Sequence, residues 1–171
     1  MRTVANAVAE AARTAARIPR VDDPLQALED FPRFLVDALD RLGDPRARER
    51  PDAERWSLCE QLWHLADLER EGWLVRIERL LAEDAPALAD FDGDAIAEQR
   101  DYRSKDPYLG LQRFRAARTS ALARLRGLNA EQWKRAGTQE GVGALTLADL
   151  PRRMRAHDAG HRAEIEALLA R

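Results

Sequence analysis

The stretch LCEQLWHLADLEREGWLVRIERLL at residues 58–81 decides the fold, because its apolar residues recur every three or four positions. That period is typical of an amphipathic α-helix with one buried face. Ser57 can cap the first turn, and Glu60, three residues later, completes the pattern of a capping box. The stretch LADLPRRMRAHDAGHRAEIEALLA at residues 147–170 has the same period, and Thr146 can cap it. The sequence therefore predicts a long helix at each of these places.

Two further segments carry the same helical period. Residues 25–42 have an apolar stripe that ends at Gly43, and glycine commonly terminates helices. Pro32 lies inside this stripe, so we expect a kink there. Residues 107–125 form the next long helix, which ends before Gly127. Together with the two stretches above, these segments predict an all-α chain, a four-helix bundle with long crossover connections.

The connections between the long helices contain proline and glycine. Residues 84–106 are expected to hold one short helix around Ala95–Tyr102, and another helical turn is expected near Glu131–Lys134. The stretch GTQEGVGAL at residues 137–145 is expected to be a glycine-rich loop. The composition argues against a large sheet, because 31 alanine and 23 leucine residues stand against 10 valine and isoleucine residues.

The N-terminal residues are less apolar than the long helices. Valine and alanine residues at helical spacing predict a weakly apolar helix over residues 3–18. We assign residues 1–20 to an extra N-terminal helical arm and residues 21–171 to one bundle domain. A chain of 171 residues is long enough for one domain to bury a core without disulfides or structural metals.

Composition excludes several classes of protein. The 28 basic and 30 acidic side chains give a net charge of −2, so no basic excess suits a nucleic-acid backbone. No run approaches the ~18 apolar residues of a membrane span, and the first residues lack the apolar core of a secretory signal. The single cysteine, Cys59, cannot form an intramolecular disulfide, and its place on the apolar side of its helix indicates packing. We expect a cytoplasmic protein that binds neither nucleic acid nor membrane.

Histidine is the scarce residue, with only His64, His157 and His161. At 100° per residue, His157 and His161 share one helical face with Leu150 and Met154, so both histidines are expected to face the core. Two side chains four residues apart on a helix are about 5–6 Å apart, which lets two imidazoles reach one metal ion. A metal would also explain why an apolar stripe tolerates them.

His64 lies on the acidic side of its helix, opposite the apolar stripe. Residues 56–84 hold seven acidic side chains against three arginines, a balance that attracts cations. We therefore expect a metal in a cleft at the edge or end of the bundle. Three histidines would leave positions for water or substrate, as in catalytic zinc sites. The alternative is that His64 is an ordinary surface histidine and the HxxxH spacing is coincidental.

Three acidic residues are candidates to support the histidines. Asp158 could accept the N–H of a ligating imidazole, although a surface ion pair with a neighbouring arginine explains it equally well. Glu60 and Asp67, and also Glu71, could orient a ligand or transfer a proton, or could form a solvated helix face. The four tryptophans are interpreted as packing in the core or at its rim.

Several motifs together resemble the DinB/YfiT-like superfamily of metal-dependent proteins. They are the histidine in the middle of the helix at 58–81, the segment LQRFRAARTSALARLRGL at 111–128, the G-x-x-T-L loop at 143–147, and HDxxH at 157–161. The resemblance covers about residues 25–170. It implies the four-helix bundle of that family, with His64, His157 and His161 as the ligands of a divalent metal, nickel or zinc. It also implies the chemistry of characterised members, several of which transfer low-molecular-weight thiols such as bacillithiol or mycothiol.

Three functions follow from these observations. The first is metal-assisted S-transfer, in which the ion holds the thiolate of a small thiol cofactor next to an electrophilic small-molecule substrate. The second is metal-dependent hydrolysis. The third is a non-catalytic bundle that binds a structural ion or none and forms a homodimer, which is the commonest soluble assembly.

Overall fold

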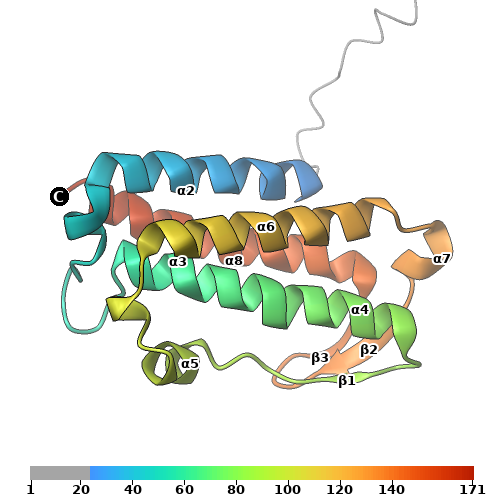
Figure 1. Cartoon of the computed structure of the whole chain (residues 1–171). Coiled ribbons are helices and arrows are strands. Elements are labelled where there is room, and N and C mark those ends of the chain that lie inside the picture. Colours follow the sequence, from blue (N-terminus) through green and yellow to red (C-terminus); the bar gives the residue numbers. More distant parts are fainter. Residues whose placement is uncertain (1–23) are drawn as a thin grey trace, which may run out of the picture.

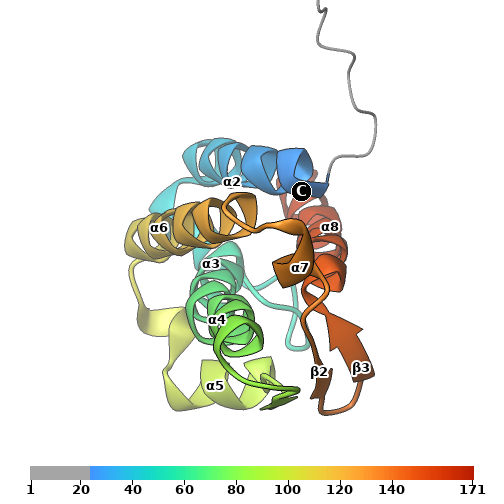
Figure 2. The ribbon, with the colours of Figure 1, turned by 90° about the vertical axis from the view of Figure 1, so that its right-hand side faces the viewer.

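The computed structural model describes residues 24–171. The predicted helix at 3–18 and the predicted arm at 1–20 lie outside the described residues. Within the described part, four long helical segments run lengthwise beside one another (Figures 1 and 2). They are α2 (Pro24–Ala47), α3 with η1 and α4 (Leu58–Asp67, Leu68–Trp73 and Leu74–Ala82), α6 (Pro107–Arg126), and α8 (Leu150–Leu169). The prediction of an all-α four-helix bundle is confirmed.

Several of the predicted helix signals are present in the structure. The Ser57 hydroxyl accepts the N–H of Glu60, and the Glu60 carboxylate accepts the N–H of Ser57, so the capping box is present. Gly43 has φ 70° and interrupts α2, whereas the helix continues through Pro32 with helical dihedral angles. Thr146 caps a 3₁₀ turn, η3 (Leu147–Asp149), that leads into α8.

A π-helical turn interrupts the second long helix. The π turn η1 joins α3 to α4 without a break in the chain of helical turns. Gly72 lies in this turn, and a Cβ there would come within 2.5 Å of Leu68 Cδ1. The sequence period indicated one uniform helix, but a π turn adds a residue per turn and changes the faces that later residues present.

The stretch at 137–145 forms a hairpin, which corrects the expectation of a loop. The strands β2 (Ala136–Gln139) and β3 (Gly143–Thr146) pair antiparallel, with Gly137 opposite Leu145. Gly141 and Gly143 have φ 70° and 92°, conformations that suit glycine in a tight turn. The strand β1 (Ala87–Leu88) adds to β2 in parallel, giving the sheet order β1-β2-β3. This sheet is small, so the class remains all-α.

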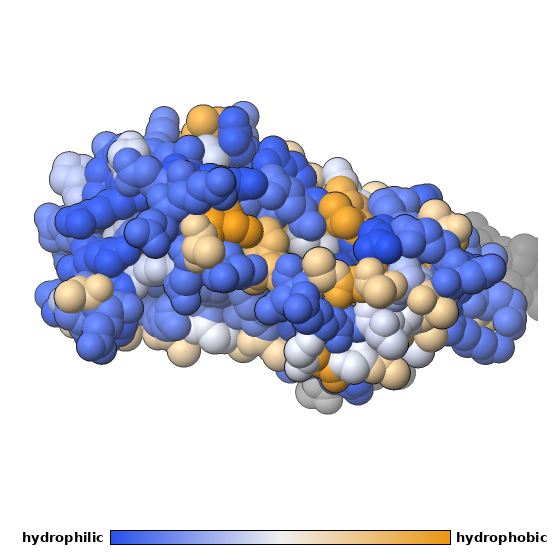
Figure 3. All heavy atoms as spheres, turned by 90° about the horizontal axis from the view of Figure 1, so that it is seen from below, coloured by the Kyte–Doolittle hydropathy of each residue, from blue (hydrophilic) through white to orange (hydrophobic). Residues whose placement is uncertain are grey.

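The connection between α4 and α6 folds over the second long helix. It contains α5 (Gly93–Gln99) and η2 (Tyr102–Ser104), and a last short helix, α7 (Ala130–Trp133), follows α6. Figure 1 shows α5 beneath α3, on the side away from α2 and α6. All ten residues of α3 are consequently buried. The outer face that carries α5 and the strands is mainly hydrophilic, with small separate apolar patches (Figure 3).

All four long segments contribute to the core. One cluster joins Phe31, Leu62, Phe114 and Ile165, which come from α2, α3, α6 and α8. A second cluster fills the other end of the bundle. Within residues 24–171, the structure has no helix whose length and apolar content would let it cross a membrane.

Candidate metal centre

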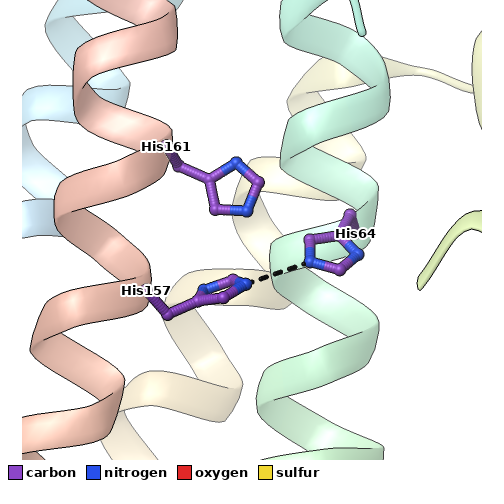
Figure 4. Close-up of side chains that lie close together, drawn as sticks. All are labelled: His64, His157 and His161. Carbon is purple, nitrogen blue, oxygen red and sulfur yellow. Dashed lines mark hydrogen bonds between the residues drawn. The ribbon is translucent and has the colours of Figure 1, made fainter. Parts of the chain in front are cut away.

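The three histidines meet between α3 and α8 (Figure 4). His64 comes from the middle of α3, while His157 and His161 lie four residues apart on α8. The Nε2 atoms of His64 and His157 are 3.2 Å apart. One nitrogen atom from each ring can be chosen so that all three lie within 4.8 Å of one another. The structure thus brings together the three residues that the sequence singled out.

Burial keeps the three imidazoles neutral. Loss of contact with water, and to a lesser extent the nearby His157, lower the pKa of His64 to about 3. Burial is also the main reason why the pKa of His157 is lowered to about 4 and that of His161 to about 2. A neutral imidazole has a free lone pair at one nitrogen, which is the form that binds metals.

The hydrogen bonds of the rings fit a metal-binding role. Gln61 Oε1 can only accept a hydrogen bond, so at 3.0 Å it assigns the hydrogen of His161 to Nδ1 and leaves the lone pair on Nε2. The Nδ1 atoms of His64 and His157 are buried and have no hydrogen-bond partner within residues 24–171. Buried polar atoms without partners are uncommon, and a bound ion is one explanation for them. Three neutral imidazoles with incomplete hydrogen bonding fit a divalent ion such as zinc or nickel.

Aromatic rings and one glycine surround His64. The ring centroid of Trp56 is 4.9 Å from that of His64, and that of Phe91 is 5.9 Å away. Gly93, the first residue of α5, is so close that a Cβ would come within 2.6 Å of His64 Cε1. Trp73, from the π turn, lies with its ring centroid 6.4 Å from that of His157.

A cavity of about 370 Å³ gives access to the histidines. His64 and His161 form part of its wall, and the remaining lining residues are Glu54, Arg55, Trp56, Gly93, Asp94 and Glu164. Most of these other residues are exposed, so the cavity opens to solvent. The expectation of an open cleft agrees with this arrangement, although His64 itself is only 7% exposed.

Comparison with known proteins identifies the family. The sequence profile of the DinB superfamily matches residues 27–165. This chain belongs to the DinB superfamily. A curated relative named "Putative metal-dependent hydrolase YfiT", from Bacillus subtilis (strain 168), is 28% identical over 114 residues. That match covers 67% of this chain and 64% of the relative, which is less than two thirds of the relative's length.

The family's bundle is also found among solved structures. YfiT from Bacillus subtilis, described there as "a probable metal-dependent hydrolase with an unusual four-helix bundle topology", has a TM-score of 0.77 to this chain. The two sequences are 26% identical, and the match covers 85% of this chain and 83% of that one. The overall arrangement of helices in this chain therefore agrees with that of a solved structure.

The acidic residues that the sequence suggests as supports for the histidines bind arginines instead. Asp158 is buried and accepts hydrogen bonds from Arg118 at 2.7 and 3.0 Å, not from a histidine or from a surface arginine. Glu60 accepts from Arg50 at 3.0 Å. The acidic side of α3, which the sequence indicates as a solvated face, is therefore covered. The arginines that bind its carboxylates come from other segments of the chain.

Asp67 and Glu71 share one arginine. Arg100 donates to Asp67 at 2.6 Å and to Glu71 at 3.1 and 2.8 Å. The Tyr102 hydroxyl donates to Asp67 at 2.7 Å; burial, and then this contact, raise the pKa of Tyr102 well above its usual range. These carboxylates fasten the connection at 84–106 onto α3 and η1.

Some residues of the site could not be named from the sequence alone. Gln61 lies three residues before His64, on an adjacent part of the same helical face, and this spacing was the one available signal for it. Trp56, Phe91 and Gly93 reach His64 through tertiary folding. Cys59, by contrast, is fully buried as predicted and donates to the carbonyl oxygens of Tyr102 and Lys105 at 3.4 and 3.2 Å.

Proposed function

We propose that the protein binds one divalent metal ion through His64, His157 and His161 and uses it in an enzymatic reaction. The observation that carries this proposal is the convergence of three neutral imidazoles whose ligand nitrogens lie within 4.8 Å of one another. Three protein ligands leave positions for a small molecule, as in catalytic zinc sites. Imidazole suits both zinc and nickel, the two ions that we propose.

The proposed reaction joins the sulfur of a low-molecular-weight thiol to an electrophilic carbon of a substrate. The thiol gives up its proton to solvent, a C–S bond forms, and the carbon's bond to a leaving group such as a halide, or the C–O bond of an epoxide, breaks. A divalent ion in the site would lower the pKa of a thiol and favour its anion. The chain supplies a cavity of about 370 Å³ whose walls include Trp56 and Gly93. Such a reaction needs no protein base for the thiol, which suits a site whose buried carboxylates Asp67 and Asp158 are bound to arginines.

Metal-dependent hydrolysis is the second candidate, because the relative YfiT carries that description. Hydrolysis requires a group that accepts a proton from water. Glu164 lines the cavity three residues after His161 on α8, and it is exposed. We propose Glu164 for this role in the hydrolytic reaction.

Metal content is the first test. Protein purified without a histidine tag is expected to contain about one divalent ion per chain, and His157→Ala is expected to contain none. Elemental analysis of both proteins, before and after incubation with zinc or nickel, measures this directly. Wild-type protein that neither contains nor takes up a divalent ion would exclude both reactions.

Assays of the metal-loaded protein then separate the reactions. Consumption of an aryl halide or an epoxide that requires a small thiol, and that disappears in His157→Ala, supports S-transfer. Cleavage of esters or amides without a thiol, reduced in Glu164→Gln, supports hydrolysis. Unfolding on chelation, with neither activity, supports a structural ion in a non-catalytic bundle.

A further inference from the structure

We propose that Arg118 is a positioning residue of the metal centre, which holds the helix of His157 in register with the helix of His64. The proposal rests on the metal-binding function proposed above. Arg118 lies on α6, which carries none of the three histidines, yet it binds both segments that do. It acts through two carboxylates, Glu69 and Asp158.

The contacts of Arg118 form a closed set of charge-assisted hydrogen bonds. Its Nε and Nη2 atoms donate to the two oxygens of Glu69 at 2.8 and 2.9 Å. Its Nη1 and Nη2 atoms donate to the two oxygens of Asp158 at 2.7 and 3.0 Å. Nη1 also donates to the carbonyl oxygen of Leu28 on α2 at 3.2 Å. All five N–H directions of the guanidinium are therefore engaged, on three different helical segments.

The two carboxylates lie a short distance along the chain from the proposed metal ligands. Asp158 directly follows His157 on α8, so a clamp on Asp158 limits rotation of α8 about its axis. Glu69 belongs to the π turn that follows α3, five residues after His64. The same turn presents Trp73 to the His157 ring. From α6, Arg118 thus holds the two backbone segments that carry His64 and His157. The separation of these segments sets the distance between the two histidines.

Stability alone is a poor explanation for this cluster. Arg118, Glu69 and Asp158 are 1%, 1% and 5% exposed. Removing charges from water is costly, and a packed apolar cluster of similar volume is often as stable as a buried ion pair. A metal site, however, needs its ligands held to within about 0.5 Å and 10–20°, which rigid hydrogen bonds provide. π turns are also frequent at functional sites.

The guanidinium geometry matters as well as the charge. A lysine at position 118 would keep the positive charge but has three donors on one atom, so it cannot bind both carboxylates through two oxygens each. Arg118→Lys therefore tests orientation with the charge preserved. Arg124 offers a matched control, since it lies on the same helix and binds both oxygens of Glu78 at 2.6 and 2.7 Å, but at the surface.

The experiment uses Co²⁺ as the probe ion in the full-length protein. Affinity is measured by competition with a chelator, and ligand geometry is measured from the visible absorption of bound Co²⁺. Each variant is measured at a temperature where its own unfolding curve shows it fully folded. We expect Arg118→Lys to lose about 10–100-fold in affinity, as for other residues that orient metal ligands, and to change the Co²⁺ spectrum. Arg124→Lys is expected to match the wild type in both.

A second variant keeps the test decisive if Arg118→Lys does not fold. Arg118→Met combined with Glu69→Gln and Asp158→Asn leaves no unpaired buried charge, and it is expected to show the same loss of affinity and altered spectrum. A folded variant of either kind with wild-type affinity and spectrum would overturn the positioning role. If the wild type itself binds no Co²⁺, zinc or nickel, the metal-binding function fails, and the positioning role fails with it.

Discussion

Gly93 and His64 are in direct contact, such that a Cβ atom on residue 93 would lie 2.6 Å from His64 Cε1 and 2.8 Å from its Nδ1. Real Cβ atoms do not approach other atoms this closely, so the histidine ring or the start of α5 would have to move. The contact explains why a residue without a side chain begins α5, next to the three histidines.

Gly93→Ala is therefore expected to weaken metal binding by about 10–100-fold, the range found when a group that orients a metal ligand is changed. Metal affinity by chelator competition is the measurement. The matched control is Gly160→Ala on α8, where a Cβ would meet no atom of the described part of the chain within 4 Å. That control is expected to leave affinity unchanged and to raise stability by up to about 1 kcal/mol, because alanine favours helices. Equal affinities in the two variants would contradict this role for Gly93.

Metal removal is expected to lower the stability of the folded protein. A ligand that binds only the folded state adds about 2.7 kcal/mol to the free energy of unfolding at a concentration of 100 times its Kd. Chemical denaturation with and without zinc measures this difference. His161→Ala, which loses a ligand and its bond to Gln61, is expected to show little zinc-dependent stabilisation. Equal stabilisation of the variant and the wild type would exclude His161 as a ligand.

Local signals in the sequence predict the long helices and the three histidines of the site. The capping box of Ser57 and Glu60 involves residues three apart, and the spacing of His157 and His161 places both on one helical face. Such spacings within one helix do not depend on how the helices pack against one another. They were sufficient to predict a bundle and to select the histidines as a group.

The rest of the site depends on contacts between distant segments. The acids of α3 look like a solvated face in a helical projection, but Asp67 is bound by Arg100, which is 33 residues further along. Asp158 and its partner Arg118 are 40 residues apart. The sequence does not predict the hairpin formed by β2 and β3, because its glycines resemble those of a loop and its strands have only four residues each. No helical or strand period can reveal these pairings.

The pH dependence of stability provides a test of the Arg50–Glu60 pair. Burial would raise the pKa of Glu60, but hydrogen bonds from Arg50 and Ser57 outweigh it and lower the pKa below that of an ordinary glutamate. Stability from this pair is therefore complete above the pKa of an unfolded glutamate, about 4.3, and is lost as the pH falls through the lower folded value.

Glu60→Gln keeps the size of the side chain and an acceptor for the Ser57 N–H but removes the charge. We expect a loss of about 1–2 kcal/mol at pH 7, somewhat less than the range of about 1.5–3 kcal/mol for charged hydrogen bonds, because the Arg50 side chain is 32% exposed and partly screened by water. Near pH 3 the difference is expected to shrink, since Glu60 is increasingly protonated. Urea unfolding of both proteins at the two pH values measures it, and a difference that does not change with pH would contradict the ion-pair explanation.

Cys59 is expected to be inert in the folded protein. Burial raises the pKa of its thiol to about 11, so only about one thousandth is thiolate at pH 8, and its sulfur is fully covered. A disulfide reagent such as 5,5′-dithiobis(2-nitrobenzoate) should label the chain in urea but not in buffer. Cys59→Ala should retain metal affinity and any thiol-dependent turnover, because the reacting thiol is then supplied by the small molecule. Rapid labelling of the folded protein would show that the Cys59 thiol is accessible. Loss of turnover in Cys59→Ala with metal affinity intact would identify Cys59, and not the small thiol, as the nucleophile.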